Sequence, residues 1–535
     1  MISGVPRKIL ALRGRLTRMR SDEATSAFVR HNRSVWSSSP TYSEREVLFE
    51  YNSLCSCVLA YSYFANVLAQ IHDAKIKAYD FSRRSRFVPD STRTAFQSFN
   101  TDVFSVELTP ELEAERDSII SRIGYRNLSK KELVDLVIDG IHIGDLVYDQ
   151  HLREYNVPTV DPKSELFSLT LRESIGLFVY WQHYLDTHDV RAVNVSHCVY
   201  RYGIILRLAV QRDIPVYQIN ATHGYRLSKE NLWAYDDFYY YPAKFRELGL
   251  DVKAAGLVEA EARLARRFNG EAGVDMKYSS KSAYGDRKGE RVVVASPRTK
   301  VFVALHCFFD NPHPYGIGYF PDFYEWLNFL GEVSLKTDYD WYLKTHPDFL
   351  PGNRDVIQGF LDRYPKFNLV PNETSHHQLI SEGIDVALTV HGTIGFEYAA
   401  LGVPVVNASP CNPHVAYKFN LHPRSFNEYK SIVMNLAGVR ISIDPAEVRE
   451  YYYMRNIRTT RDWLFGDYEL LLKEIGGYKG QFTSKSYAWF LANFTPDRHV
   501  AIRDGLVRFV ESEDYCFGIQ HLNAARGLSA NDVLR

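Results

Sequence analysis

The stretch that decides the fold reads Ile384-Asp-Val-Ala-Leu-Thr-Val-His391-Gly-Thr-Ile-Gly-Phe-Glu397-Tyr-Ala-Ala-Leu-Gly-Val-Pro-Val-Val406. The apolar run Val386–Val390 predicts a buried strand, and Ile394–Leu401 has the apolar spacing of a helix. Val403–Asn407 then predicts a second strand. Because strands joined by a helix pair in parallel, the stretch predicts an α/β domain with helices on both faces of its sheet.

The same alternation extends through residues 286–445. Strands are predicted at Val292–Ala295, Val301–Leu305, Trp341–Lys344 and Phe367–Val370, and helices at Phe320–Leu335, Arg354–Tyr364 and Ser375–Glu382. This segment is therefore predicted to be one doubly wound, Rossmann-like domain.

An earlier copy of the pattern predicts a second Rossmann-like domain over residues 46–285. Its strands are predicted at Glu46–Tyr51, Lys75–Tyr79, Ala192–Ser196 and Val216–Asn220, and its helices at Leu54–Ile71, Phe167–Tyr184 and Tyr202–Gln211. Residues 255–290 are charged and poor in large apolar side chains, which is typical of a linker. Two such domains place a cleft between the carboxyl ends of their sheets.

Length and composition limit the remaining possibilities. A chain of 535 residues is too long to form a single hydrophobic core. Residues 1–45 are predicted to be a basic appendage. Residues 446–535 are predicted to be C-terminal helices that can cross back to the first domain. The net charge of −1 does not indicate a nucleic-acid partner. The six cysteines lack CxxC spacing, the N-terminus lacks a secretory signal, and Val58–Ile71 is too short and polar for a membrane span. A cytoplasmic location is expected.

The first twenty residues form a basic amphipathic segment. They contain no acidic residue, and their apolar side chains recur at spacings of three and four; the basic residues are Arg7, Lys8, Arg13, Arg15, Arg18 and Arg20. This pattern fits peripheral contact with an anionic membrane at its cytoplasmic face. The alternatives are a helix docked on its own domain or a frayed terminus.

The turn at residues 391–393 is a candidate phosphate site. Gly392 permits close approach of the backbone to a ligand, and a helix that starts at Thr393 offers N–H donors to an anion. Glu397 follows about one turn into the helix, where a carboxylate can accept hydrogen bonds from a ribose diol. The alternative is an ordinary strand-turn-helix in which Thr393 caps the helix and Glu397 is exposed.

This segment resembles the nucleotide-sugar half of GT-B enzymes, including capsule transferases and UDP-sugar 2-epimerases. In those enzymes a small-residue turn holds phosphate, a helical Glu holds ribose, and an LGxPVV strand follows. The corresponding residues here are His391-Gly392-Thr393, Glu397 and Leu401–Val406. Epimerases usually have a Ser-Gly-Gly turn at this point, so the His-Gly-Thr turn weakens that alternative.

Two further segments are similar to donor-binding parts of surface-carbohydrate enzymes. Lys344-Thr-His346-Pro347 resembles a KxHP turn, in which Lys344 or His346 would neutralise donor phosphate. The stretch His306-Cys-Phe-Phe-Asp310-Asn-Pro-His313 resembles an HxFxDxPH segment, which places Asp310 and His313 near the donor. His306, Asp310 and His313 could also suggest a metal, but GT-B transfer does not generally need one, so neither metal nor cofactor is expected.

The candidate catalytic residues lie in the first domain. Asp145 belongs to Ile143–Asp149, which resembles an IGDLIYD segment of surface-polysaccharide proteins, and His197 and His223 each follow a predicted strand. Glycosyl transfer needs a general base or a carboxylate nucleophile. Asp145 fits either role and the histidines fit the first. Alternatively, Asp145 caps a turn and the histidines bind acceptor or backbone groups.

Taken over residues 45–440, the chain resembles bacterial capsule-biosynthesis transferases, among which Kdo transferases that use CMP-Kdo are prominent. The resemblance implies a GT-B glycosyltransferase with a nucleotide-sugar donor and an oligosaccharide or lipid-linked acceptor. The alternatives are a polyol-phosphate transferase of the teichoic-acid type, a nucleotide-sugar 2-epimerase and a non-catalytic sugar-binding scaffold.

Overall fold

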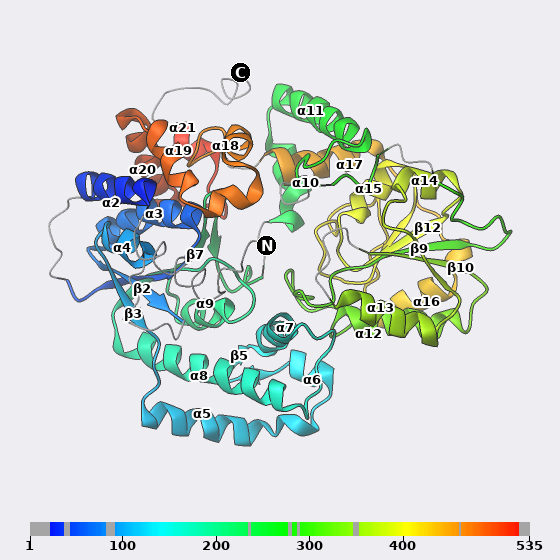
Figure 1. Ribbon diagram of the computed structural model, residues 1–535, viewed down its shortest axis with the longest axis horizontal. Helices are drawn as coiled ribbons and strands as arrows, with labels where there is room; N and C mark the ends of the chain where they lie inside the picture. Colours follow the sequence, from blue (N-terminus) through cyan, green and yellow to red (C-terminus); the bar gives the residue numbers. More distant parts are fainter. Residues whose placement is uncertain are drawn as a thin grey trace, which may run out of the picture.

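The computed structural model describes residues 22–36, 43–81, 91–233, 237–276, 281–285, 289–345, 352–458 and 462–523. The chain has the GT-B architecture, in which two parallel sheets, each covered by helices on both faces, form two domains that face each other (Figure 1). The segment 1–20, for which membrane contact is predicted, lies outside the described residues.

The first sheet has six strands in the order β3-β2-β1-β6-β7-β8, of which only β8 is antiparallel to its neighbour. The strands are β1 (Glu46–Glu50), β2 (Lys75–Asp80), β3 (Thr101–Ser105), β6 (Val190–Asn194), β7 (Val216–Ile219) and β8 (Gly224–Leu227). Helix α3 (Cys55–His72) packs with Val47 and Phe49 on one face. Helices α7 (Gly144–Tyr155), α8 (Glu165–Thr187) and α9 (Tyr202–Gln211) cover the other.

The second sheet has five parallel strands in the order β11-β10-β9-β12-β13. They are β9 (Lys300–Ala304), β10 (Asp340–Lys344), β11 (Phe367–Leu369), β12 (Val386–Thr389) and β13 (Val405–Asn407). Helices α12 (Phe323–Ser334), α13 (Asn353–Arg363) and α16 (Phe426–Met434) cover one face. Helices α14 (His376–Ser381) and α15 (Ile394–Ala400) cover the other.

Both sheets reverse their strand order at a central point. In the first sheet the reversal lies between β1 and β6, and in the second between β9 and β12. Helices leave to opposite faces at such a point, so the carboxyl ends of the two strands enclose a crevice in which ligands of open α/β sheets bind. A ligand-binding site is therefore expected among the residues that follow these four strands.

The segment between the domains differs from the prediction. Residues 292–295 do not form a strand, and part of the predicted linker is the helix α11 (Leu250–Phe268), preceded by α10 (Tyr241–Glu247). These helices pack against Phe396 and Tyr451 of the second domain. The apolar stripe of α11 was easy to miss because it includes Gly256 and Ala260, and Gly256 lies directly against the ring of Tyr453.

The C-terminal helices return to the first domain. After α17 (Pro445–Tyr452), the helices α18 (Tyr468–Ile475), α19 (Lys485–Ala492), α20 (Pro496–Glu511) and α21 (Ile519–Asn523) lie beside α3 and α2 (Glu23–Val35) (Figure 1). The predicted C-terminal helices are short, and α19 ends a few residues before Pro496, which suits only the first turn of a helix. None of the described helices combines the length and apolar character needed to cross a membrane.

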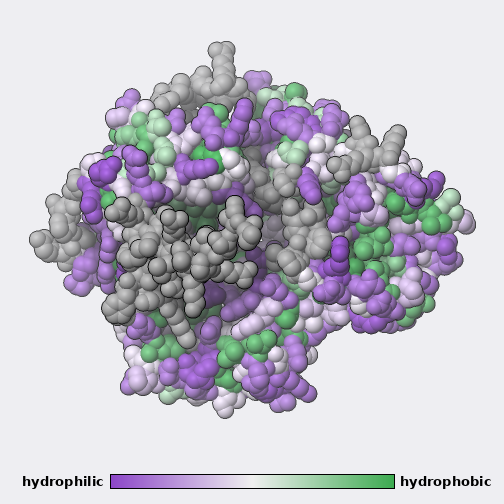
Figure 2. All heavy atoms as spheres, in the orientation of Figure 1, coloured by the Kyte–Doolittle hydropathy of each residue, from purple (hydrophilic) through white to green (hydrophobic). Residues whose placement is uncertain are grey.

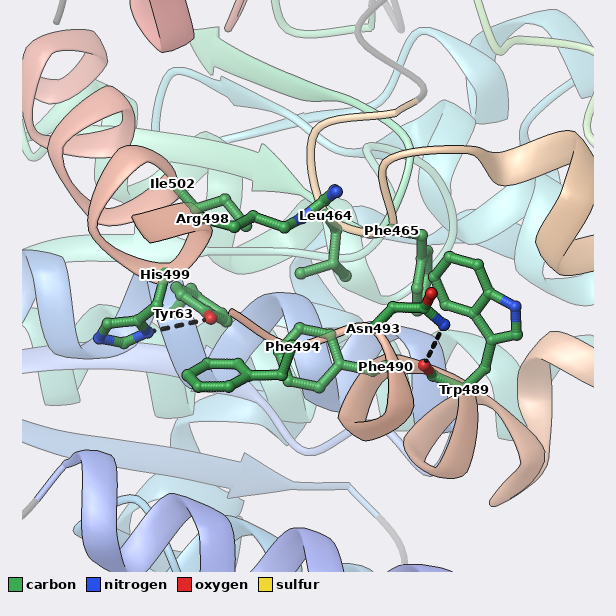
Figure 3. Close-up of a pocket in the computed structure, with 10 residues that line it drawn as sticks. All are labelled: Tyr63, Leu464, Phe465, Trp489, Phe490, Asn493, Phe494, Arg498, His499 and Ile502. Atoms are coloured by element: carbon green, nitrogen blue, oxygen red, sulfur yellow. Dashed lines mark hydrogen bonds between the residues drawn. The ribbon is translucent and has the colours of Figure 1, made fainter. Parts of the chain in front are cut away.

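An aromatic pocket lies where α19 and α20 meet α3 (Figure 3). Its lining includes Tyr63, Trp489, Phe490, Phe494 and His499. Its volume of about 10 Å³ is enough for one water molecule at most. The pocket is a packing feature of the domain and is too small for a sugar or a nucleotide.

Candidate functional site

His197 follows β6 at the reversal point of the first sheet. Its Nδ1 lies 2.8 Å from Ser196 Oγ, and its Nε2 makes no hydrogen bond to any residue that the structure describes. The side chain is exposed, and yet desolvation by the surrounding protein lowers the pKa of this imidazole. The ring is therefore open to solvent, while enough protein surrounds it to disfavour its charged form.

His391 follows β12 at the reversal point of the second sheet. Its ring centroid lies 4.7 Å from that of His306 and 5.3 Å from that of Tyr315. Its Nε2 is buried without a hydrogen-bond partner among the described residues. Burial lowers the pKa of His391 to about 4, so the ring is neutral at physiological pH.

Asp310 connects these two histidines. Its Oδ1 accepts hydrogen bonds from the Tyr200 hydroxyl of the first domain at 2.6 Å and from the Asn311 backbone at 3.0 Å. The negative charge of Asp310 acts to raise the pKa of both His197 and His391 against the effect of burial. We call His197, Asp310 and His391 the junction recess. In Figure 2, hydrophilic residues predominate on the described surface of both domains, with hydrophobic residues scattered between them.

Asp145 does not lie in this recess, and its predicted catalytic role stays a prediction that these contacts do not favour. The side chain is 1% exposed, and its two oxygens lie 2.5 and 2.6 Å from the Arg207 guanidinium. Trp233 Nε1 donates a further hydrogen bond to Asp145 Oδ2 at 2.8 Å. Burial alone would raise the pKa of Asp145, but the charge of Arg207 holds it at about 2. A carboxylate with both oxygens engaged and no access to solvent is structural.

The motif that carries Asp145 instead forms a joint between the domains. Tyr148 and Asp149 share one face of α7 with it, since they follow at spacings of three and four. Tyr148 donates a hydrogen bond of 2.6 Å to Asp322, and His313 Nδ1 donates one of 2.7 Å to Asp149. His313 is 1% exposed and belongs to this joint, and its predicted role in donor binding stays a prediction.

The joint is expected to stabilise the protein less as the pH rises. Burial raises the pKa of Asp149 to about 6, and Asp149 raises the pKa of His313 above its usual value although burial opposes this. Both groups therefore bind protons more tightly in the folded state. Such protons stabilise the fold at low pH, and that stabilisation is lost as the pH rises through the folded pKa values.

This pH dependence is tested by comparing the wild type with the double variant Asp149→Asn/His313→Gln. The two new side chains are polar but do not titrate. From pH 6 to pH 8 the wild type should lose about 1–2 kcal/mol of unfolding free energy relative to the variant. Urea unfolding at the two pH values measures this difference. A difference that stays constant or grows with pH would contradict the account.

Both ring nitrogens of His223 lie near hydrogen-bond partners, so its role as a base stays a prediction that this geometry does not favour. Its Nε2 accepts a hydrogen bond of 2.9 Å from Asn220 Nδ2, because Asn220 Oδ1 accepts from the backbone N–H groups of Thr222 and His223. Nδ1 lies 3.3 Å from the Thr222 hydroxyl. Burial lowers the pKa of His223 to about 3. The residue therefore fixes the turn after β7.

The His391-Gly392-Thr393 turn is tighter than predicted. The Gly392 N–H donates to Thr389 Oγ1 at 3.1 Å and is not available to a phosphate. A Cβ at Gly392 would lie 2.9 Å from Thr389 Oγ1, so glycine is required here by contacts within the protein. Thr393 is exposed at the start of α15, and its predicted role in donor binding stays a prediction.

Two predicted donor ligands are engaged with the protein itself. Lys344 Nζ donates to the carbonyl oxygens of Pro371 at 3.2 Å and Asn372 at 2.9 Å, and burial lowers its pKa to about 8. Lys344 thus holds the loop after β11. Glu397 is 4% exposed, pairs with Arg267 and accepts a hydrogen bond of 2.8 Å from the Tyr284 hydroxyl.

The ribose contact of Glu397 stays a prediction, which its pairing with Arg267 does not favour. Burial would raise the pKa of Glu397, but the charge of Arg267 lowers it, so the carboxylate is ionised and neutralised by α11. His346, the remaining predicted phosphate ligand, lies outside the described residues.

His306, Asp310 and His313 do not converge on a metal site. The His306 ring stacks on Phe323 at 4.4 Å, Asp310 turns to Tyr200, and His313 pairs with Asp149. Within the described ranges, no group of three or more His, Cys, Asp or Glu side chains is arranged to hold a metal ion.

Two residues around the recess, Glu50 and Tyr200, were not predicted from the sequence. Glu50 ends β1 and accepts a hydrogen bond of 3.0 Å from the Ser196 N–H, and Tyr200 positions Asp310 from a left-handed backbone conformation with φ of 56°. The signal for Glu50 was present, because an acidic residue ends an apolar strand at a predicted sheet edge. The pairing of Tyr200 with Asp310 joins distant segments and left no local signal.

No family model and no curated protein matches the chain. Solved structures that match include the UDP-GlcNAc 2-epimerase of Neisseria meningitidis bound to UDP-GlcNAc, which is 10% identical over 76% of this chain and 97% of its own, with a TM-score of 0.20. A glycosyltransferase of Rickettsia africae is 9% identical over 85% of this chain and 100% of its own, with a TM-score of 0.24.

The UDP-GlcNAc 2-epimerase of Methanocaldococcus jannaschii, in complex with UDP-GlcNAc and UDP, is 11% identical over 76% of this chain and 97% of its own, with a TM-score of 0.22. These TM-scores are too low to support an argument about this chain. The fold is assigned from the strand order of the two sheets, and the function is inferred from the junction recess.

Proposed function

We propose that this protein transfers a sugar from a nucleotide-sugar donor to a surface polysaccharide or glycolipid acceptor in the cytoplasm. The observation that supports this most strongly is the hydrogen bond of 2.6 Å from Tyr200 of the first domain to Asp310 of the second. It places one carboxylate near His197 and His391, which follow the strands at the reversal points of both sheets. A reaction between a ligand on each domain would take place at this point.

In this proposal the donor lies on the second domain beside His391 and Thr393, and the acceptor lies on the first beside His197. Nε2 of His197 takes the proton of the acceptor hydroxyl. The acceptor oxygen then bonds to the anomeric carbon, and the bond from that carbon to phosphate oxygen breaks. The nucleotide leaves with the electron pair, and no cofactor takes part.

The test is ligand-induced thermal stabilisation with CMP, UDP, GDP, CMP-Kdo and UDP-sugars, with AMP as the control. A ligand at 100 times its dissociation constant adds about 2.7 kcal/mol of stability. We expect one base to stabilise selectively, and selective stabilisation by CMP supports a Kdo donor, which the capsule-type segments favour.

Other outcomes would overturn the proposal. Stabilisation by sugars alone would indicate a non-catalytic sugar-binding scaffold. Stabilisation by a nucleotide sugar whose sugar is then epimerised without transfer would indicate an epimerase, and transfer of a polyol phosphate would indicate an enzyme of the teichoic-acid type. Equal responses to all ligands, AMP included, would remove the nucleotide site.

A further inference from the structure

Glu50 lies directly behind His197 at the reversal point of the first sheet. It is the last residue of β1, which pairs with β6, and it is 4% exposed. Its Oε2 accepts a hydrogen bond of 3.0 Å from the backbone N–H of Ser196, the residue before His197. The proposed function assigns no part to this buried carboxylate.

The Ser196 hydroxyl connects Glu50 with His197. It hydrogen-bonds to the Glu50 carboxylate, and its Oγ lies 2.8 Å from His197 Nδ1. A serine hydroxyl has a single proton to donate. When that proton points to Glu50, Oγ accepts a hydrogen bond from His197, so Nδ1 carries the proton and the lone pair is on Nε2.

We propose that Glu50, acting through Ser196, fixes the tautomer of His197 and thereby directs the Nε2 lone pair into the junction recess. Glu50 and Ser196 are positioning residues in this arrangement. That His197 takes a proton from an acceptor rests on the proposed function, whereas the tautomer is a property of the protein alone. An imidazolium formed at His197 would be stabilised by the chain of hydrogen bonds to Glu50 and by Asp310.

The arrangement has a second state. When Glu50 is protonated it donates to Ser196 Oγ, the Ser196 hydroxyl donates to Nδ1, and Nε2 then carries a proton and cannot act as a base. Burial raises the pKa of Glu50 to about 7, so the two states exchange near neutral pH. The base form requires ionised Glu50 and is favoured above this pH.

Other groups face Glu50 and His197 from the neighbouring elements. Those near Glu50 are Cys57, Tyr61, Tyr79, Arg201 and Tyr202, and those near His197 are Tyr202, His223 and Asp310. Of the described groups in this list, Arg201 alone brings a permanent positive charge. The tyrosines and the thiol remain neutral in the relevant range, since burial raises their pKa values.

The test is ¹⁵N NMR of the full-length protein labelled at histidine, with His197→Gln to assign the His197 signals. At pH 8.5 we expect His197 to be mainly the Nδ1–H tautomer. Ser196→Ala and Glu50→Leu should each shift the tautomer ratio towards Nε2–H by about tenfold, because they remove a charge-assisted hydrogen bond. Glu46→Leu, which alters a buried carboxylate on the same strand, should leave the ratio unchanged.

A second measurement needs no variant. In the wild type the Nε2–H tautomer should grow as the pH falls from 8.5 through about 7. An Nε2–H tautomer at pH 8.5, or a ratio unmoved by Ser196→Ala, would overturn the inference. Failure of every nucleotide to bind would remove the proposed function but would not change this result, so the two failures are distinguishable.

Discussion

Arg207→Met is expected to lower the free energy of unfolding by about 3–5 kcal/mol, since it leaves the Asp145 carboxylate buried without its cation. The pair is almost fully buried, at 2% and 1% exposure. Arg207 also donates to the His142 carbonyl at 2.7 Å and lies over the Trp233 ring at 5.1 Å. The shift of the urea midpoint at constant slope measures the loss.

Two further variants make this prediction specific. Arg191→Met removes an exposed partner of Asp189 and should cost about 0–1 kcal/mol. The double variant Asp145→Leu/Arg207→Met removes both charges and should recover part of the loss. If Arg207→Met is no more destabilising than Arg191→Met, Asp145 is not held in a buried ion pair and is free to take part in catalysis.

His197→Ala is expected to lower kcat of transfer about 100- to 10,000-fold, the usual contribution of a positioned general base. The affinity for the donor should change little, because the donor is proposed to lie on the second domain. Steady-state kinetics with the donor found by thermal stabilisation, together with its dissociation constant, measures both effects. A large loss of kcat with unchanged donor affinity identifies a group that acts on the reacting atoms.

The matched control is His188→Gln. His188 precedes β6 and so lies at the opposite end of the strand that His197 follows, with Nδ1 near the Tyr184 carbonyl. Its kcat should remain within about threefold of the wild type, since it is remote from the recess. Retention of full activity by His197→Ala would show that another group takes the acceptor proton.

Much of the fold could be predicted from the sequence because strands in a buried parallel sheet are continuous apolar runs. The predicted strands Lys75–Tyr79 and Trp341–Lys344 lie within one residue of β2 and β10, and the helix at Tyr202–Gln211 matches α9. The helix that was not predicted lacks such an apolar run. Helix α11 buries small residues such as Gly256 and Ala260, and no large apolar stripe marks them.

The candidate site was harder to predict, because residue type does not show which side of an element faces a partner. Asp145 and Glu397 are acidic residues at expected positions, but each meets an arginine from a segment far along the chain, Arg207 and Arg267. His197 and His223 looked alike in sequence. Only the hydrogen bonds show that the nitrogens of His223 are engaged and that Nε2 of His197 has no hydrogen-bond partner among the described residues.

The central claim is that the junction recess binds a nucleotide sugar, and the most direct measurement adds CMP, UDP and GDP in turn to protein labelled with ¹⁵N-histidine. The account predicts that one nucleotide shifts the signals of His391 and, more weakly, His197, which share Asp310, and leaves His188 unmoved. If no nucleotide shifts either recess histidine, or if the shifts are confined to histidines elsewhere, the recess is not the nucleotide site.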